Sequence, residues 1–200
     1  MEERKIVVAD PTPLGLFGLA MVTLVASSAK LGLTSGVSFV IPWAIFLGAS
    51  AQLYASIQDA KKNNMFGATA FGAYAFFWYS VAFSWLIQSG LFGAELAEKA
   101  DPKQLGIAFI GYLIFTLYMT VGALSTNKVL FMIFVFIDFL FLGLSFSTLH
   151  VMEELMHNIA AISELIISLL SFYGSAAIVI NTQLGKVVLP LGKPLYKKAL

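Results

Sequence analysis

In Asp10-Pro11-Thr12-Pro13-Leu14-Gly15-Leu16, a short charged tail gives way to an apolar run that continues to Ala29. An aspartate carboxylate accepts hydrogen bonds from free backbone N–H groups, and proline is tolerated in the first helical turn, where its missing donor has no partner to lose. The stretch therefore predicts the start of a membrane helix. Gly15 and Gly18 leave one side of that helix without bulky side chains, so that a neighbouring helix or a small solute can approach its backbone.

The composition indicates an integral membrane protein. Of the 200 residues, 59% are hydrophobic and 12% are charged, whereas soluble domains carry about one quarter charged residues. The formal net charge of +1 argues against nucleic acid as a partner. Without cysteine the chain has no thiolate metal site and no thiol nucleophile. We expect membrane lipid around the protein and no cofactor.

Six segments are long and apolar enough to cross a bilayer, which takes about twenty residues. They are 13–31, 37–57, 67–88, 105–124, 129–149 and 159–184. Residues 1–9 and 185–200 are tails, and the connection 89–104 is predicted to hold a short interfacial helix at 95–100. The predicted fold is therefore all-α, with one membrane domain over residues 1–200.

Basic residues predict the orientation, because lysine and arginine stay on the cytoplasmic side of a membrane. With six spans, the side of the two termini holds nine of them: Arg4, Lys5, Lys61, Lys62, Lys128, Lys186, Lys193, Lys197 and Lys198. The other side holds Lys30, Lys99 and Lys103. We expect both termini to be cytoplasmic, in the plasma or inner membrane, and Lys30 to extend toward the lipid headgroups.

Several blocks of the chain resemble the acetate uptake transporter family, which includes bacterial YaaH-type succinate-acetate permeases and fungal acetate transporters. Pro11-Thr12-Pro13-Leu14-Gly15-Leu16 is similar to the family's N-P-x-P-L-G-L signature. Other similar pieces follow in the family's order: Ala51-Gln52, Lys61-Lys62, Phe66-Gly67, Thr69-Ala70-Phe71, Tyr74, Phe77-Trp78, Phe115-Thr116, Gly122-Ala123-Leu124 and Val188-Leu189-Pro190-Leu191-Gly192.

The resemblance implies six transmembrane helices around a pore in each protomer, with protomers gathered in a homo-hexameric ring. It implies transport of acetate, and in some members succinate or other small monocarboxylates, through a channel or with a proton. Family members have a narrow apolar waist, whose three positions match Leu19, Tyr74 and Ile137. At the first signature position Asp10 replaces the usual asparagine; both residues cap helices, but a carboxylate at a pore mouth opposes an incoming anion unless it points away or is neutralised.

Uncharged donors are the expected partners of a carboxylate substrate, because apart from Lys30 near an end the spans hold no lysine or arginine. Gln52 is the first candidate, with hydrogen bonding to a facing helix as the structural alternative. Tyr74 adds a phenolic donor. Thr23 lies four residues after Leu19, on the same helical face, although a hydroxyl bonded back to its own helix is the simpler interpretation.

Asp138 and Glu164 are the carboxylates inside the spans, where each costs on the order of 2.5 to 3.5 kcal/mol near the membrane centre. One interpretation is a protonated acid that shares a hydrogen bond between helices. The other is proton coupling of transport.

Four residues near the end of the fifth span have helical spacing that could suit a zinc ion: His150 with Glu154, and Glu153 with His157. The order differs from the H-E-x-x-H motif of metalloproteases, and the second E-x-x-H copy of di-iron bundles is missing. A solvated loop face, with some sensitivity to external pH, is therefore favoured over a metal site.

Three other function classes stay open. A channel for a small neutral solute such as urea, ammonia or undissociated acetic acid would be insensitive to substrate charge. A membrane enzyme is disfavoured, because the spans hold no G-x-S-G motif and no histidine pair in the apolar region. A purely structural scaffold is the remaining alternative.

Overall fold

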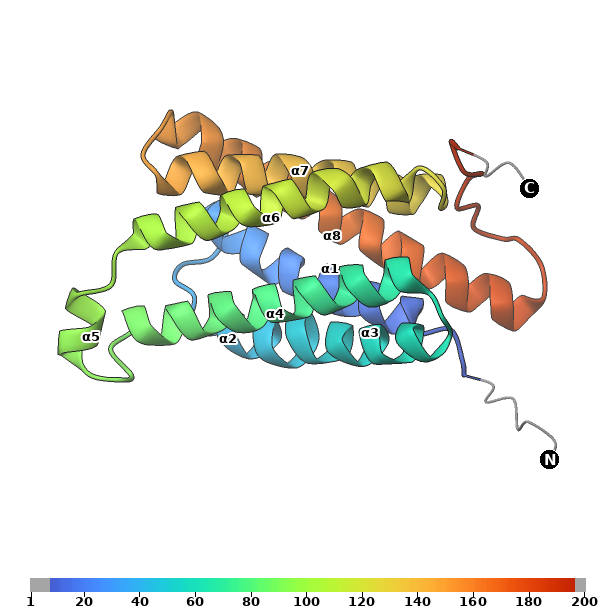
Figure 1. The fold of residues 1–200 in the computed structure, drawn as a ribbon, viewed down its shortest axis with the longest axis horizontal. Helices are drawn as coiled ribbons and strands as arrows, with labels where there is room; N and C mark the ends of the chain where they lie inside the picture. The colour runs from blue at the N-terminus through green and yellow to red at the C-terminus, as the bar shows by residue number, and fades with distance from the viewer. Residues whose placement is uncertain (1–7, 197–200) are drawn as a thin grey trace.

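A computed structural model describes residues 8–196, and over this range the chain is helical with no strand (Figure 1). The predicted tail lysines and arginine at positions 4, 5, 197 and 198 lie outside the described residues. Six helical spans are long and apolar enough to cross a membrane. They are Thr12–Lys30 (α1), Val40–Lys61 (α2, Val40–Trp43; η1, Ala44–Ala51; α3, Gln52–Lys61), Met65–Gln88 (α4), Pro102–Ala123 (α6), Lys128–Thr148 (α7) and Glu153–Leu184 (α8). The short helix α5, Ala94–Glu98, lies in the predicted place between α4 and α6.

Capping side chains explain why three helices begin before the predicted apolar runs. Asn64 accepts from the Gly67 N–H, Asp101 from the Lys103 N–H, and Asn127 from the Leu130 N–H. Each cap satisfies a backbone donor that would otherwise be free at a helix start.

Two spans continue into polar sequence that hydropathy assigned to the connections. The second runs past Ile57 to Lys61, and the last begins at Glu153, two turns before Ile159. The first extension places Asp59 on the same helix as Gln52. Because the two are seven residues apart, they share one helical face.

Contacts between neighbouring spans close into a ring. In order around it, α1 packs on η1 and α3, α3 on α4, α6 on α7, α7 on α8, and α8 on α1. The ring closes between α4 and α6, where the Tyr112 hydroxyl donates to the Ala73 carbonyl oxygen at 3.0 Å. The first and last described residues lie at one end of the ring, the termini end, and α5 lies at the other, the α5 end.

The second glycine of the first span allows a close approach between helices. Gly18 faces the Leu47 carbonyl of the π-helix η1, and a Cβ added there would lie 3.1 Å from the Ala51 Cβ. The Ser50 hydroxyl donates to the Ile45 carbonyl five residues earlier, in π-helical register. Gln52 directly follows this segment, which is of a kind often found at functional sites.

Candidate functional site

Two cavities lie inside the helical ring. The termini-side cavity has a volume of about 320 Å³ and is lined from α1, α3, α4, α7 and the α6–α7 connection. The α5-side cavity has a volume of about 250 Å³ and is lined mainly from α4, the start of α6 and the ends of α1 and α7. The interior of the ring is therefore hollow toward both ends.

Aromatic rings lie between the two cavities. Tyr74 lines the termini-side cavity, and Phe77, one turn further along α4, lines the α5-side cavity. The Phe141 ring of α7 packs against both, with centroid distances of 6.4 Å to Tyr74 and 5.1 Å to Phe77. These three residues, which we call the aromatic plug, separate the cavities.

The structure brings the three residues of the predicted waist to one place. Leu19 of α1, Tyr74 of α4 and Ile137 of α7 are all buried, and all line the termini-side cavity beside the aromatic plug. Their side chains are apolar apart from the Tyr74 hydroxyl. Their role as a constriction stays a prediction.

The Tyr74 hydroxyl is already engaged and is not a free donor. The Thr116 hydroxyl donates to the Tyr112 carbonyl oxygen at 2.8 Å. Because a hydroxyl has one proton, Thr116 Oγ1 must accept from the Tyr74 hydroxyl, which lies 2.9 Å away. This bond ties α4 to α6 and fixes the ring of Tyr74 at the plug.

A double-mutant cycle measures this tie. We expect Thr116→Val to destabilise the protein by about 1 to 3 kcal/mol, because it leaves the buried Tyr74 hydroxyl without its acceptor. Tyr74→Phe removes that hydroxyl, so Thr116→Val in the Tyr74→Phe background should cost clearly less. Thermal unfolding in detergent measures all four proteins; equal costs in both backgrounds would contradict the assigned bond.

The termini-side cavity presents several hydrogen-bond acceptors, and the Asn64 amide, whose Oδ1 accepts from the Gly67 N–H, adds a donor group. Three hydroxyls that line it donate their protons within the chain: Thr12 to Asp10 Oδ1, Ser125 to the Gly122 carbonyl, and Thr126 to the Ala123 carbonyl. Each hydroxyl can then offer only oxygen lone pairs to a molecule in the cavity.

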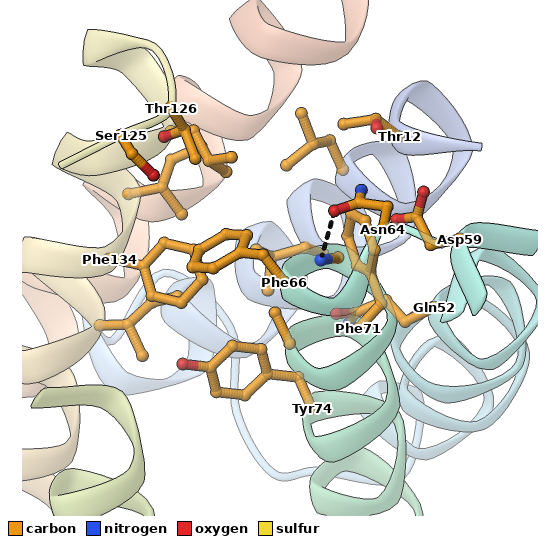
Figure 2. Close-up of a pocket in the computed structure, with 17 residues that line it drawn as sticks. Thr12, Gln52, Asp59, Asn64, Phe66, Phe71, Tyr74, Ser125, Thr126 and Phe134 are labelled. Atoms are coloured by element: carbon orange, nitrogen blue, oxygen red, sulfur yellow. Dashed lines mark hydrogen bonds between the residues drawn. The ribbon is translucent and has the colours of Figure 1, made fainter. Parts of the chain in front are cut away.

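Gln52 and Asp59 add two buried acceptors to the same cavity (Figure 2). Gln52 Nε2 donates to the Gly48 carbonyl of its own chain segment at 2.6 Å. Among the described residues, Gln52 Oε1 and Asp59 Oδ2 have no hydrogen-bond partner. Sequence reasoning selected Gln52 but missed Asp59, although its seven-residue spacing from Gln52 was readable.

The α5-side cavity is lined by a charged pair. Lys30 Nζ lies 2.8 Å from Glu164 Oε2, and both residues border the cavity. The expectation that Lys30 extends toward the headgroups is wrong, because its side chain turns into the ring to meet α8. The lining of this cavity is therefore charged, whereas the sequence predicted uncharged donors for the substrate.

Comparison with known proteins decides the family. Residues 1–193 match the family described as the GPR1/FUN34/yaaH family. The chain belongs to this family. The resemblance inferred from the signature and the later blocks is thereby confirmed.

Named relatives of the GPR1/FUN34/yaaH family are similar over most of the chain. The succinate-acetate/proton symporter SatP of Escherichia coli (strain K12) is 32% identical over 185 residues, which cover 92% of this chain and 96% of that protein. Acetate permease A of Emericella nidulans is 32% identical over 157 residues, covering 73% of this chain and 51% of the permease. A solved structure of the bacterial acetate channel SatP covers 93% of this chain and 100% of its own, with a TM-score of 0.85 and 30% identity. The chain is thus an all-α, multi-pass cell membrane protein.

Asp10, where the family signature has asparagine, is held at the protein surface. Its Oδ1 accepts from the Thr12 N–H at 3.1 Å and from the Thr12 hydroxyl at 2.7 Å. The N-cap residue of α1 is Pro11, so the prediction that Asp10 occupies the cap position is wrong by one residue. Lys62 Nζ lies 3.9 Å from Asp10 Oδ1. Asp10 is therefore close to Lys62 and is not among the residues that line the termini-side cavity.

Two further sequence candidates lie outside both cavities of this family member. The Thr23 hydroxyl donates to the Leu19 carbonyl at 2.7 Å, which is the bond back to its own helix. Asp138 Oδ2 accepts from the Thr120 hydroxyl at 2.8 Å and joins α7 to α6. Neither residue lines a cavity described above.

The His150–His157 cluster does not have the geometry assumed from its spacing. Helix α7 ends at Thr148, and His150 and Met152 have positive φ angles of 60° and 50° before α8 begins. His150 Nδ1 therefore meets Glu153 Oε2 at 2.9 Å instead of Glu154. Within residues 8–196, no group of three or more His, Cys, Asp or Glu side chains could hold a metal ion.

Proposed function

We propose that this chain carries acetate and related small monocarboxylates, with succinate as a further substrate, across the cell membrane. The observation that carries the proposal is a pair of cavities, one toward each end of a single helical ring, with an aromatic plug between them. The SatP symporter and the SatP channel structure support it by their similarity over almost the whole chain. We assign the chain no catalytic reaction.

The waist gives a physical reason for selectivity. A small anion must shed water to pass Leu19, Tyr74 and Ile137, and an apolar constriction can gate by dewetting. The methyl group of acetate gains apolar contact there, whereas chloride or sulfate gains none. Weak contacts between the anion and the cavities on both sides of the waist allow the anion to be released.

We further propose that the substrate moves together with a proton and that Asp59 holds that proton. A proton on Asp59 turns its Oδ2, which has no partner among the described residues, into a donor for the substrate carboxylate, and Gln52 Oε1 remains an acceptor in the same cavity. Asp138 and Glu164 were the candidates suggested by sequence, but the first lies off both cavities and the second is paired with Lys30.

The same acceptors favour a second candidate function, passage of small neutral molecules that carry N–H or O–H groups, such as ammonia or undissociated acetic acid. This function differs from the first in its response to substrate charge. It needs neither Lys30 nor a proton-carrying residue.

We also propose that both termini are cytoplasmic and that the protein is a homo-hexamer. Described lysines at the termini end support the orientation: Lys61, Lys62, Lys128, Lys186 and Lys193. Large exposed apolar residues on one helix, α6, give lipid or neighbouring protomers a surface to cover: Ile107, Ile114, Leu117, Tyr118 and Val121. Native mass spectrometry of the purified protein tests the stoichiometry.

Flux into proteoliposomes tests the function. We expect radiolabelled acetate, formate and succinate to enter faster than into protein-free vesicles, and urea to enter at the protein-free rate. Competition by unlabelled acetate controls for leak. Vesicles tight to every carboxylate would contradict the proposal, and urea or ammonia flux without carboxylate flux would favour the second candidate.

A further inference from the structure

The ion pair between α1 and α8 is buried where charges are costly. The Glu164 side chain is 2% exposed and that of Lys30 is 20% exposed, with 2.8 Å between Nζ and Oε2. Removing two charges from water costs more than their mutual attraction commonly returns. A pair in this place therefore calls for a role beyond joining two helices that already pack closely.

The rest of the α5-side cavity matches a small amphipathic anion. Lys30 and Glu164 supply charge, and aromatic rings form much of the remaining lining, including Phe77, Trp78 and Trp85. A monocarboxylate such as acetate has the same two parts, a carboxylate and an apolar methyl group. Phe77 belongs to the aromatic plug, so this cavity ends at the plug, and the waist residues lie on the other side of it.

Contacts other than the ion pair hold α1 against α8 near Lys30. The ring Nε2 of His157 on α8 lies 3.0 Å from the Lys30 carbonyl oxygen. Further along the same two helices, the Ser168 hydroxyl donates to the Ala20 carbonyl at 2.8 Å. Helices α1 and α8 are therefore joined without the ion pair, and the four-carbon stem of Lys30 can turn its ammonium group toward the cavity.

We propose that Lys30 is a carboxylate-binding group for the substrate in the α5-side cavity, and that Glu164 is a built-in competitor for its ammonium group. The proposal rests on the proposed function for its ligand class. An ammonium group has three N–H donors, so an incoming carboxylate can take one or two of them while Glu164 keeps the rest and is not left unpaired. Because Lys30 is already desolvated against a carboxylate, exchanging one carboxylate for another adds little desolvation cost. The competition keeps binding weak enough for release toward the waist.

Opposite effects of two substitutions distinguish this role from a structural brace. Glu164→Gln removes the competitor and should lower the acetate concentration for half-saturation by about tenfold, or roughly 1.4 kcal/mol. Lys30→Gln removes the binding charge and should raise it by about tenfold. A brace would lose stability in both variants and gain affinity in neither.

Tryptophan fluorescence reads the binding. Two of the three tryptophans, Trp78 and Trp85, line this cavity, whereas Trp43 lies on α2. A Trp43→Phe background leaves the two reporters, and purified protein in detergent is titrated with sodium acetate against sodium chloride at fixed pH and ionic strength. Lys30→Arg, which keeps the charge, should retain most of the affinity.

The outcomes are decisive in each direction. Weaker binding in both charge-removing variants, together with lower melting temperatures, would overturn the proposal in favour of a brace, and so would unchanged binding in both. If Lys30→Gln fails to fold, Glu164→Gln decides alone, since only tighter binding supports competition. Acetate flux is also measured in proteoliposomes. If the protein carries acetate but acetate binding does not depend on Lys30, this inference is wrong and the proposed function stands. If acetate binding depends on Lys30 but the protein carries no acetate, the binding site stands and the proposed transport function is wrong.

Discussion

Replacing Ile137 by tryptophan should reduce acetate flux by at least about tenfold, because an indole at a dewetting constriction leaves little room for an anion and its remaining water. Ile137 is buried, borders the termini-side cavity with Leu19 and Tyr74, and lies on α7 within one turn of the Phe141 ring. The measurement is the initial rate of radiolabelled acetate uptake into proteoliposomes, after subtraction of the protein-free rate.

Phe139→Trp is the matched control on the same helix. Phe139 is 48% exposed and lines neither cavity, so the same indole there should leave uptake close to that of the unmodified chain. Overpacking at Ile137 can cost about 1 to 3 kcal/mol, so melting temperature and elution volume must show that the variant is folded. Folded Ile137→Trp protein that carries acetate at the unmodified rate would place the constriction elsewhere.

Tyr74→Ala should act in the opposite direction. Removing the ring opens the aromatic plug, so larger monocarboxylates such as butyrate should gain more in uptake rate than acetate does. This pair of opposite effects separates a steric waist from a general loss of fold.

Hydropathy was sufficient for the spans because burial in lipid demands about twenty apolar residues whatever the packing. It failed at their ends. Asp101 and Asn127 begin helices by capping, and the polar turns before Lys61 and after Glu153 belong to helices that extend past the apolar runs. The capping residues can be identified in the sequence. The polar extensions form because other helices pack against them, and a hydropathy profile contains no information about that packing.

The candidate site was predictable only in part. Leu19, Tyr74 and Ile137 are far apart in the chain, and family resemblance, not spacing, grouped them. The meeting of Lys30 with Glu164 depends on how α1 and α8 are rotated against each other, which composition does not encode. In the histidine cluster, only the predicted helical pairing of His150 with Glu154 is wrong, because the chain turns with positive φ at His150 and meets Glu153 instead.

Asp59→Asn should convert electroneutral acetate transport into electrogenic transport. If one proton accompanies each acetate, no net charge crosses the membrane, and an applied potential does not drive uptake. The asparagine keeps the shape of Asp59 but cannot carry a proton, so acetate would cross as a bare anion. A potential of about 60 mV, positive inside, should then support about tenfold accumulation, because one charge moved through 100 mV is worth roughly 2.3 kcal/mol.

Potassium diffusion potentials set by valinomycin provide the measurement, with the protein-free signal subtracted because undissociated acetic acid crosses lipid unaided. The charged neighbours Asp10 and Lys62 remain in the variant, so their field on position 59 is unchanged. Asp138→Asn is the matched control, since that carboxylate bonds Thr120 between helices and lines neither cavity; it should stay electroneutral. Electroneutral transport in Asp59→Asn would remove Asp59 as the proton carrier. Electrogenic transport in Asp138→Asn instead would give the role to Asp138, one of the two carboxylates that the sequence suggested for proton coupling. An unmodified protein already driven by the potential would show that the anion crosses without a proton, leaving the unpaired acceptors of the termini-side cavity to bind water.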